Sequence, residues 1–165
     1  MGNISNNITY KEATKSNTAK RYGIKNEPND FQLQNMKMVA NECFQPLREM
    51  HKKAIGISSF LRSKKLNQHP AINGSKTSQH LQGLYSKLEE GAIDIDADIY
   101  DNGITNKEIF NWLKDNVQFD QLIWEYGTDK EPAWVHISFR KGANRNMMLT
   151  AYKKQNGYSG YSLRK

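Results

Sequence analysis

The spacing of apolar residues changes along this chain, and the change restricts the possible folds more than any other feature. From Asp30 to Met50, apolar residues recur at intervals of three and four, which predicts a helix of about twenty residues that is kinked at Pro46. Thr105 and Glu108 form a capping-box pattern, which predicts a second helix over 106–116. Strand-like segments are predicted at 121–126, 134–139 and 147–152, with shorter ones at 54–58 and 92–95. Helices followed by neighbouring strands predict an α+β fold with an antiparallel sheet.

The length of the chain, 165 residues, is that of one domain. The first 28 residues are polar and irregular, apart from a short helix that we expect around residues 10–20. We therefore predict an N-terminal arm over 1–28, a folded domain over 29–152 and a short C-terminal tail over 153–165. We expect the tail to be too short to form a separate domain.

The composition excludes several classes of protein. No stretch approaches eighteen apolar residues, which excludes a membrane-spanning helix, and the N-terminus lacks the apolar core of a secretory signal, so we expect synthesis in the cytoplasm. The single cysteine, Cys43, lies on the apolar face of the first long helix and is predicted to be a buried structural thiol. A net charge of +7 favours an anionic partner. The cations are scattered in pairs, however, and no nucleic-acid reading motif is present, so we expect no nucleic acid as partner.

Two of the four histidines and one aspartate occur in separate segments that could together form a metal site. His136 alternates with apolar residues, which places it with Trp134 and Ser138 on the polar face of a strand. His80 follows a polar loop, and Asp94 lies in a separate strand-like segment. Two imidazoles and one carboxylate from separate elements can form a three-ligand zinc set that leaves a fourth position for water. On the residues alone, scattered surface or core histidines remain the alternative, and this alternative is favoured for His51 and His69.

Five motifs occur together in an order that resembles a known family. The resemblance is to the zinc D-Ala-D-Ala carboxypeptidase and VanY-like peptidases, particularly small phage and bacterial members that act on peptidoglycan. It implies a fold in which helices pack on a small antiparallel sheet that carries the zinc site, as in hedgehog-like domains. It also implies that Zn²⁺ is bound by His80, Asp94 and His136. The motifs are S-S-F-L-R-S at 58–63, G-S-K-T-S-Q-H at 74–80, A-I-D-I-D at 92–96, F-D-Q-L-I-W-E at 119–125 and W-V-H-I-S at 134–138.

The sequence departs from the family pattern at two places. The interval between His80 and Asp94 is fourteen residues, longer than is usual in the family, and we interpret the extra residues near 84–90 as a surface loop. Many relatives carry an acid three residues before the last histidine, where this chain has Ala133. The general base is therefore predicted to be Glu125, from the Q-L-I-W-E motif, with Glu131 as the second candidate.

The resemblance also assigns residues to the substrate. Arg62 matches the family's substrate arginine, which implies that its guanidinium pairs with a peptide carboxylate or stabilises the oxyanion of the reaction. Ser78, Gln79 and Trp134 are expected to line or shape the substrate site. Asp96 is expected to be a supporting or surface acid.

The predicted function is zinc-dependent hydrolysis of peptide bonds in peptidoglycan stem peptides by a monomer, as part of phage lysis. Zinc would polarise the scissile carbonyl and lower the pKa of its bound water, whose proton a nearby carboxylate accepts. The sequence leaves open whether the enzyme is a D-Ala-D-Ala carboxypeptidase or an L-Ala-D-Glu endopeptidase. The alternative is an inactive relative that binds the cell wall or forms part of a virion, and Ala133 and the longer His80–Asp94 interval keep that alternative open.

Overall fold

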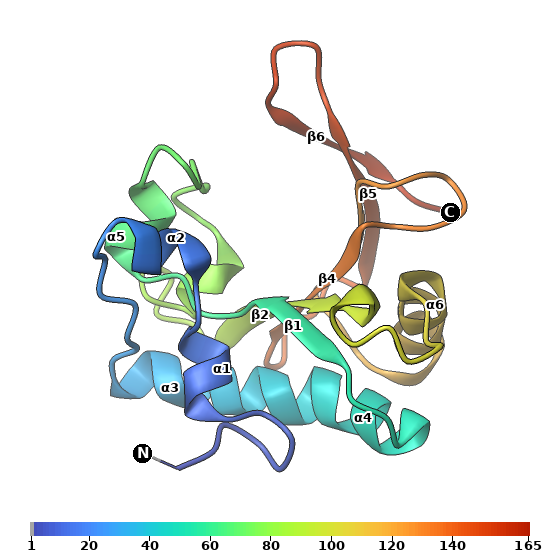
Figure 1. Cartoon of the computed structure of the whole chain (residues 1–165), viewed down its shortest axis with the longest axis horizontal. Helices are drawn as coiled ribbons and strands as arrows, with labels where there is room; N and C mark the ends of the chain where they lie inside the picture. The colour runs from blue at the N-terminus through green and yellow to red at the C-terminus, as the bar shows by residue number, and fades with distance from the viewer. Residues whose placement is uncertain (1) are drawn as a thin grey trace.

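A six-stranded sheet forms the centre of the protein, with helices covering one of its faces (Figure 1). The computed structural model describes residues 2–165. The strands lie in the order β1-β2-β4-β3-β5-β6, and the α+β prediction is confirmed. The strands are β1 (Gly56–Ser59), β2 (Glu90–Asp96), β3 (Gln121–Glu125), β4 (Trp134–Arg140), β5 (Met147–Lys153) and β6 (Ser159–Leu163).

Six α-helices accompany the sheet in residues 2–165, and none of them is both long and apolar enough to cross a membrane. Helix α6 begins at the predicted capping box, in which the Thr105 hydroxyl accepts from the backbone of Glu108 and the Glu108 carboxylate accepts from the backbone of Thr105. The helices are α1 (Tyr10–Thr14), α2 (Asn17–Arg21), α3 (Asp30–Val39), α4 (Gln45–His51), α5 (Lys64–Gln68) and α6 (Asn106–Asn116).

The long helix expected from Asp30 onward is present as α3 and α4, joined by a π-helical turn over Ala40–Phe44. Pro46 explains this turn. In a regular α-helix its ring would clash with the carbonyl of Glu42 and its nitrogen would have no hydrogen to donate. The wider π-helical turn just before Pro46 is a common way to relieve such a conflict.

The two faces of the sheet have different roles. Ile93 and Ile95 of β2 and Val135 and Ile137 of β4 point to the helical side, where they join the main hydrophobic core. The alternation of the strands sends Asp94 and His136 to the opposite face. The functional residues therefore stand on a sheet whose rear face is fixed by the core.

The sheet contains one parallel pair, β3 with β5, among otherwise antiparallel neighbours. An antiparallel sheet was expected from the sequence. The difference arises because the chain leaves β4 and passes around the start of β3 before it enters β5. Asp120 holds this crossover. Its buried carboxylate accepts hydrogen bonds from Arg145 at 2.7 Å (Nε) and 2.6 Å (Nη2), and the backbone N–H of Met147 donates to the Asp120 carbonyl.

Both ends of the chain take part in this structure. Ile4, Ile8 and Ala13, from the segment predicted to be an arm, are buried in the main core. In the segment predicted to be a tail, β6 pairs with β5 over five residues. Two glycines and two serines in that segment hide the alternation by which a strand is recognised in a sequence.

Asp120→Asn is expected to lower the free energy of unfolding by about 2 kcal/mol at neutral pH, because Arg145 and Gln79 would lose a charged acceptor. Burial opposes ionisation of Asp120, but the hydrogen bonds from Arg145 and Gln79 outweigh it and hold the pKa of the carboxyl below its usual value. Because the pKa of Asp120 is lower in the folded state, its ionisation stabilises the protein at pH values above the unfolded-state pKa of about 3.9. This stabilisation is lost as the pH falls toward and below the folded-state pKa. Denaturant unfolding should therefore show a smaller difference in the free energy of unfolding between the wild type and Asp120→Asn at pH 3 than at pH 7.

The control for this experiment is Asp129→Asn, which changes an exposed acid. Equal effects of the two substitutions at pH 7 would contradict the structural role of Asp120.

Candidate functional site

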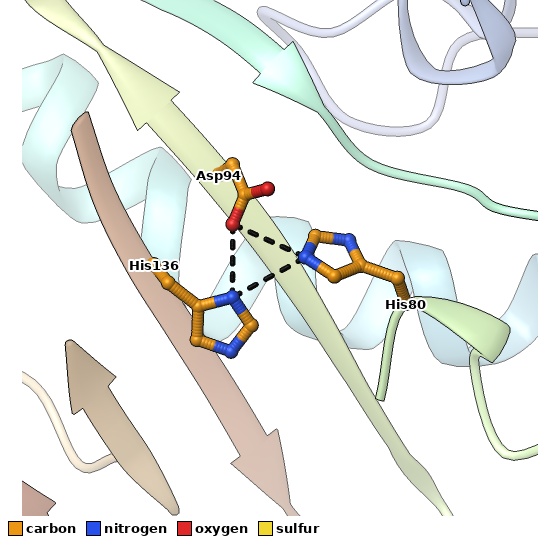
Figure 2. A group of neighbouring side chains, drawn as sticks. All are labelled: His80, Asp94 and His136. Carbon is orange, nitrogen blue, oxygen red and sulfur yellow. Dashed lines mark hydrogen bonds and ion pairs between the residues drawn. The ribbon is translucent and has the colours of Figure 1, made fainter. Parts of the chain in front are cut away.

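Three elements bring two histidines and an aspartate together on the open face of the sheet (Figure 2). Asp94 of β2 and His136 of β4 face each other in the strand register, and His80 comes from a 3-10 turn at Gln79–Leu81. Asp94 Oδ1 lies 2.8 Å from His136 Nδ1 and 3.1 Å from His80 Nε2, and the two ring nitrogens are 3.2 Å apart. All three side chains are buried.

The orientation of His80 is fixed by the backbone carbonyl of Phe60. His80 Nδ1 lies 2.8 Å from this oxygen, which can only accept, so Nδ1 carries the hydrogen and Nε2 presents its lone pair to the cluster. The backbone N–H of Arg62 in turn donates to the His80 carbonyl at 2.9 Å. Two hydrogen bonds therefore join the 3-10 turn to the segment after β1, one donated by the turn and one accepted by it.

Gln82 strengthens the same connection from within the protein. Its fully buried side chain donates to the Phe60 carbonyl at 3.2 Å and to the Ala92 carbonyl at 2.8 Å, so it joins the segment that orients His80 to the strand that carries Asp94. Gly91 leaves room for it, since a Cβ there would collide with the Gln82 amide oxygen. Nothing in the sequence pattern marked this glutamine, whose role depends on contacts with two distant segments.

The donor and acceptor chemistry of the cluster fits a cation. With Nδ1 protonated, His80 Nε2 and Asp94 Oδ1 are two acceptors that face each other at 3.1 Å, an unfavourable contact unless a positive charge lies between them. Burial, together with the charge of Arg62, lowers the pKa of His80, so a proton supplies this charge poorly at neutral pH. Ligand atoms around a tetrahedral zinc ion lie about 3.3–3.6 Å apart. The three separations in the cluster, 2.8, 3.1 and 3.2 Å, are shorter than this, so the side chains would move apart slightly to hold the ion.

The charge of Asp94 is maintained by its neighbours. Burial opposes its ionisation, but His80 and His136 outweigh that effect and hold the pKa of the carboxyl far below its usual value. Asp94 is thus an anion inside a buried site. Nitrogen and carboxylate ligands of this kind are those that zinc takes in proteins.

The long interval between His80 and Asp94 does not separate the two residues. The chain turns after Gly83, and residues 85–89 are exposed to solvent before β2 begins at Glu90. The loop is fixed by Asn35 of α3, whose amide donates to the Leu88 carbonyl at 3.1 Å. The added residues therefore extend away from the cluster.

Glu125 lies at the end of β3 on the same face of the sheet, next to Trp134 in the strand register. Burial raises the pKa of its carboxyl to about 7, with a contribution from Asp94, while His136 and Arg62 act in the opposite direction. The second candidate base, Glu131, is directed elsewhere. Its carboxylate accepts from the backbone of Lys107 at the start of α6 at 2.9 Å. The geometry favours Glu125 over Glu131.

Arg62 stands beside the cluster, with one guanidinium nitrogen 3.4 Å from Asp94 Oδ2 and Nε 3.4 Å from the Ser59 hydroxyl. Two cavities adjoin it. One, of about 300 Å³, extends toward residues 15–18 and includes Asp94, and the other, of about 580 Å³, extends toward Tyr126 and Lys153. Arg62, Ile72 and Trp134 line both, so the predicted substrate arginine and the predicted cleft tryptophan lie in the middle of a cleft.

Other residues singled out in the sequence lie away from the cluster or support it. Gln79 directs its amide to Asp120 at 2.9 Å and Glu90 at 3.4 Å, at the end of the sheet face beyond the histidines. Ser78 is partly buried, and its carbonyl accepts from the backbone of Leu81 in the 3-10 turn. Asp96 accepts from the backbone of Asp98 and from Asn106, which is a structural role.

The remaining candidates are outside the site. His51 and His69 are partly buried and belong to no metal-ligand group among residues 2–165. Cys43 is completely buried in the core, and burial raises the pKa of its thiol far above the usual value, which makes it a poor nucleophile.

Comparison with protein families identifies the chain. Residues 6–138 match the model of the peptidase M15 family, which is more than half of the sequence, and the chain belongs to this family. It is therefore a zinc metallopeptidase, and the predictions of the family and of zinc as its cofactor are confirmed. No curated protein matches the chain.

Replacing either histidine of the cluster is expected to abolish tight zinc binding. His80→Ala and His136→Ala each leave two ligands, whereas a structural or catalytic zinc site in a protein normally has at least three. Metal analysis of protein purified without added zinc should give about one zinc per chain for the wild type and far less for both variants. His69→Ala, outside the cluster, is the control and should keep its zinc.

Unchanged zinc content in His80→Ala and His136→Ala, with both variants folded by circular dichroism, would show that the metal is bound elsewhere.

Proposed function

We propose that this M15 peptidase hydrolyses peptide bonds in the stem peptides of bacterial peptidoglycan, with zinc held by His80, Asp94 and His136. The observation that carries the proposal is the opposed pair of acceptors in the buried cluster, whose Asp94 lines a cavity together with Arg62. The buried carboxylate of Glu125 lies on the same face of the sheet. This combination supplies every group that metal-assisted peptide hydrolysis needs. When bound, the zinc ion acts as a Lewis acid that polarises the scissile carbonyl and makes water more acidic.

Glu125 is the general base in this proposal. Its carboxylate accepts a proton from the attacking water and later delivers this proton to the leaving amine. A pKa raised to about 7 by burial suits both steps, because the carboxyl can gain and lose a proton near neutral pH. Glu125 thereby takes the role of the acid that many relatives carry at the position of Ala133. This argument favours an active enzyme over the inactive wall-binding relative or virion component that the sequence left open.

Arg62 binds and orients the substrate. Its guanidinium lies in the centre of the cleft, where its free nitrogen atoms can donate to a peptide carboxylate or to the oxygen that becomes negative during hydrolysis. The ion pair with Asp94 holds the side chain near the metal ligands. Trp134 borders both cavities and gives the peptide an apolar surface to lie on.

The shape of the cleft supports cleavage at an internal bond. The cavities continue on both sides of Arg62 and Trp134, so a peptide can extend in both directions from these two residues. A carboxypeptidase needs space for only one residue beyond the scissile bond. We therefore favour endopeptidase activity, such as cleavage between L-Ala and D-Glu, over removal of the terminal D-Ala.

Lysis of a bacterial host by a phage is the biological setting that we propose for this activity. The net charge of +7 suits a cell wall that carries carboxylates and other anionic polymers. Addition of the protein to bacteria with a permeabilised outer membrane should lower the turbidity of the suspension, and a stable turbidity with active enzyme would argue for wall remodelling.

Digestion of purified peptidoglycan tests the reaction itself. We expect mass spectrometry to detect new stem fragments that are absent when the protein has been treated with a chelator and that return when zinc is restored. Internal fragments would identify an endopeptidase, and free D-Ala would identify a carboxypeptidase. No product from protein that holds zinc would support the inactive wall-binding alternative.

Glu125→Gln is expected to lower kcat by about 10²- to 10⁴-fold, since the amide cannot accept the proton of water. Its zinc content should remain that of the wild type, because Glu125 is outside the ligand group. Glu131→Gln is the matched variant and should keep most of the activity, with some loss of stability at the start of α6. The reverse result, with Glu131→Gln inactive and Glu125→Gln active, would transfer the role of base to Glu131.

A further inference from the structure

The C-terminal hairpin of β5 and β6 lies beside the cleft, although it falls outside the part of the chain that matches the family. In Figure 1 the hairpin rises on one side of the sheet, opposite α2, α5 and the loop that follows α5. Ala71 and Ile72 of that loop and Lys153 of β5 line the same cavity. The hairpin therefore forms one wall of the cleft, and the loop forms the other.

The strand register places the hairpin on the same face as the cluster. Glu125 of β3 pairs with Ala151 of β5, and Ala151 pairs with Tyr161 of β6, so the three side chains share one row across the sheet. Burial, with the charges of Glu125, Tyr126 and Asp94, raises the pKa of Tyr161 to about 12, which is consistent with a position near the site. Lys153 lies two residues after Ala151 and points to the same side.

Contacts with Tyr126 position Lys153 within the cleft. Its ammonium nitrogen lies 5.0 Å from the centre of the Tyr126 ring, a cation–π distance. The Tyr126 hydroxyl is hydrogen-bonded to the Ser159 hydroxyl, and its ring packs against Trp134 with the centroids 5.3 Å apart. Lys153 is thus held over an aromatic pair that borders the substrate cavity.

The charges around this cavity have one sign. Its two charged lining residues are Arg62 and Lys153, and Arg62 already contacts Asp94. Within residues 2–165, no carboxylate lies in salt-bridge distance of Lys153. The charge of Lys153 reaches the Glu125 carboxyl, whose pKa it lowers, but the two groups form no salt bridge. A cation without a salt-bridge partner at the wall of a substrate cavity favours a ligand that brings a negative charge.

We propose that Lys153 binds a carboxylate of the substrate peptide and makes the enzyme selective for stems in which this carboxylate is free. The inference rests on the proposed function, since it assigns a contact in the same cleft. A lysine is suited to this contact because its ammonium acts as a point charge with three donors, which tolerates a carboxylate at varied angles. Selectivity would therefore depend on a residue outside the family's common region.

The test compares stem pentapeptides that differ in one group at a time. In one pair of peptides, the α-carboxylate of D-Glu at the second position is either free or amidated. In the other pair, the C-terminal carboxylate is either free or amidated. Wild type, Lys153→Met and Lys154→Met are assayed for kcat and KM, and dissociation constants are measured in the zinc-loaded Glu125→Gln background. Lys154 is the matched control, because it is an adjacent exposed lysine that does not line the cavity.

We expect the wild type to prefer one of the two carboxylates by about fivefold in KM and in dissociation constant, with a preference that falls in high salt. Lys153→Met should lose this preference with little change in kcat, Lys153→Arg should restore much of it, and Lys154→Met should keep it. A wild type without preference, or a Lys153→Met variant that keeps it, would overturn the inference while leaving hydrolysis established.

If the wild type cleaves no peptide but binds the carboxylate form through Lys153, the proposed reaction fails and the inference on binding holds. If the wild type neither cleaves nor binds any of the peptides, both are overturned.

Discussion

The antiparallel register of β2 and β4 is the constraint on which the rest of the site depends. It places Asp94 directly opposite His136, and it is held by the strand hydrogen bonds and by the apolar residues that alternate with these two on the rear face. A shift of one residue in either strand would turn its member of the cluster into the core, so the hydrophobic pattern that fixes the fold also fixes two members of the cluster. His80 is the only member supplied by a less regular segment.

That segment is stabilised by groups that have no part in the chemistry. The Phe60 carbonyl accepts from His80 and from Gln82, and Gln82 continues the connection to β2. Further along the same face, Gln79 is held by Asp120, which also fixes the crossover between β4 and β5. The position of the 3-10 turn thus depends on the strand order of the sheet, and the buried polar groups are the means by which the turn and the sheet are coupled.

Much of this arrangement could be predicted from the sequence, because local patterns determine it. The alternation around His136 predicted a strand with a polar face, and the capping box at Thr105 predicted the bounds of α6. The three-residue cluster was implied by the resemblance of five motifs to a known family, and the residues alone left scattered histidines as an alternative. The parallel pair of β3 and β5, the strand β6 and the roles of Gln79 and Gln82 could not be predicted in this way. Each depends on contacts between segments far apart in the chain, and a glutamine has the same local pattern whether it lines a cleft or joins two strands.

The hairpin at the sheet edge shows how a peripheral element gains a defined position. On the rear face, the guanidinium of Arg164 lies 3.7 Å from the centre of the Trp124 ring, and its backbone N–H donates to the Met148 carbonyl. On the cleft face, the contact between Tyr126 and Ser159 joins β6 to the end of β3. An edge hairpin attached on one face could tilt, but attachment on both faces restricts that motion. The width of the cleft is therefore set by side chains at the edge of the sheet, while the charge of Asp94, a candidate metal ligand, is set at its centre.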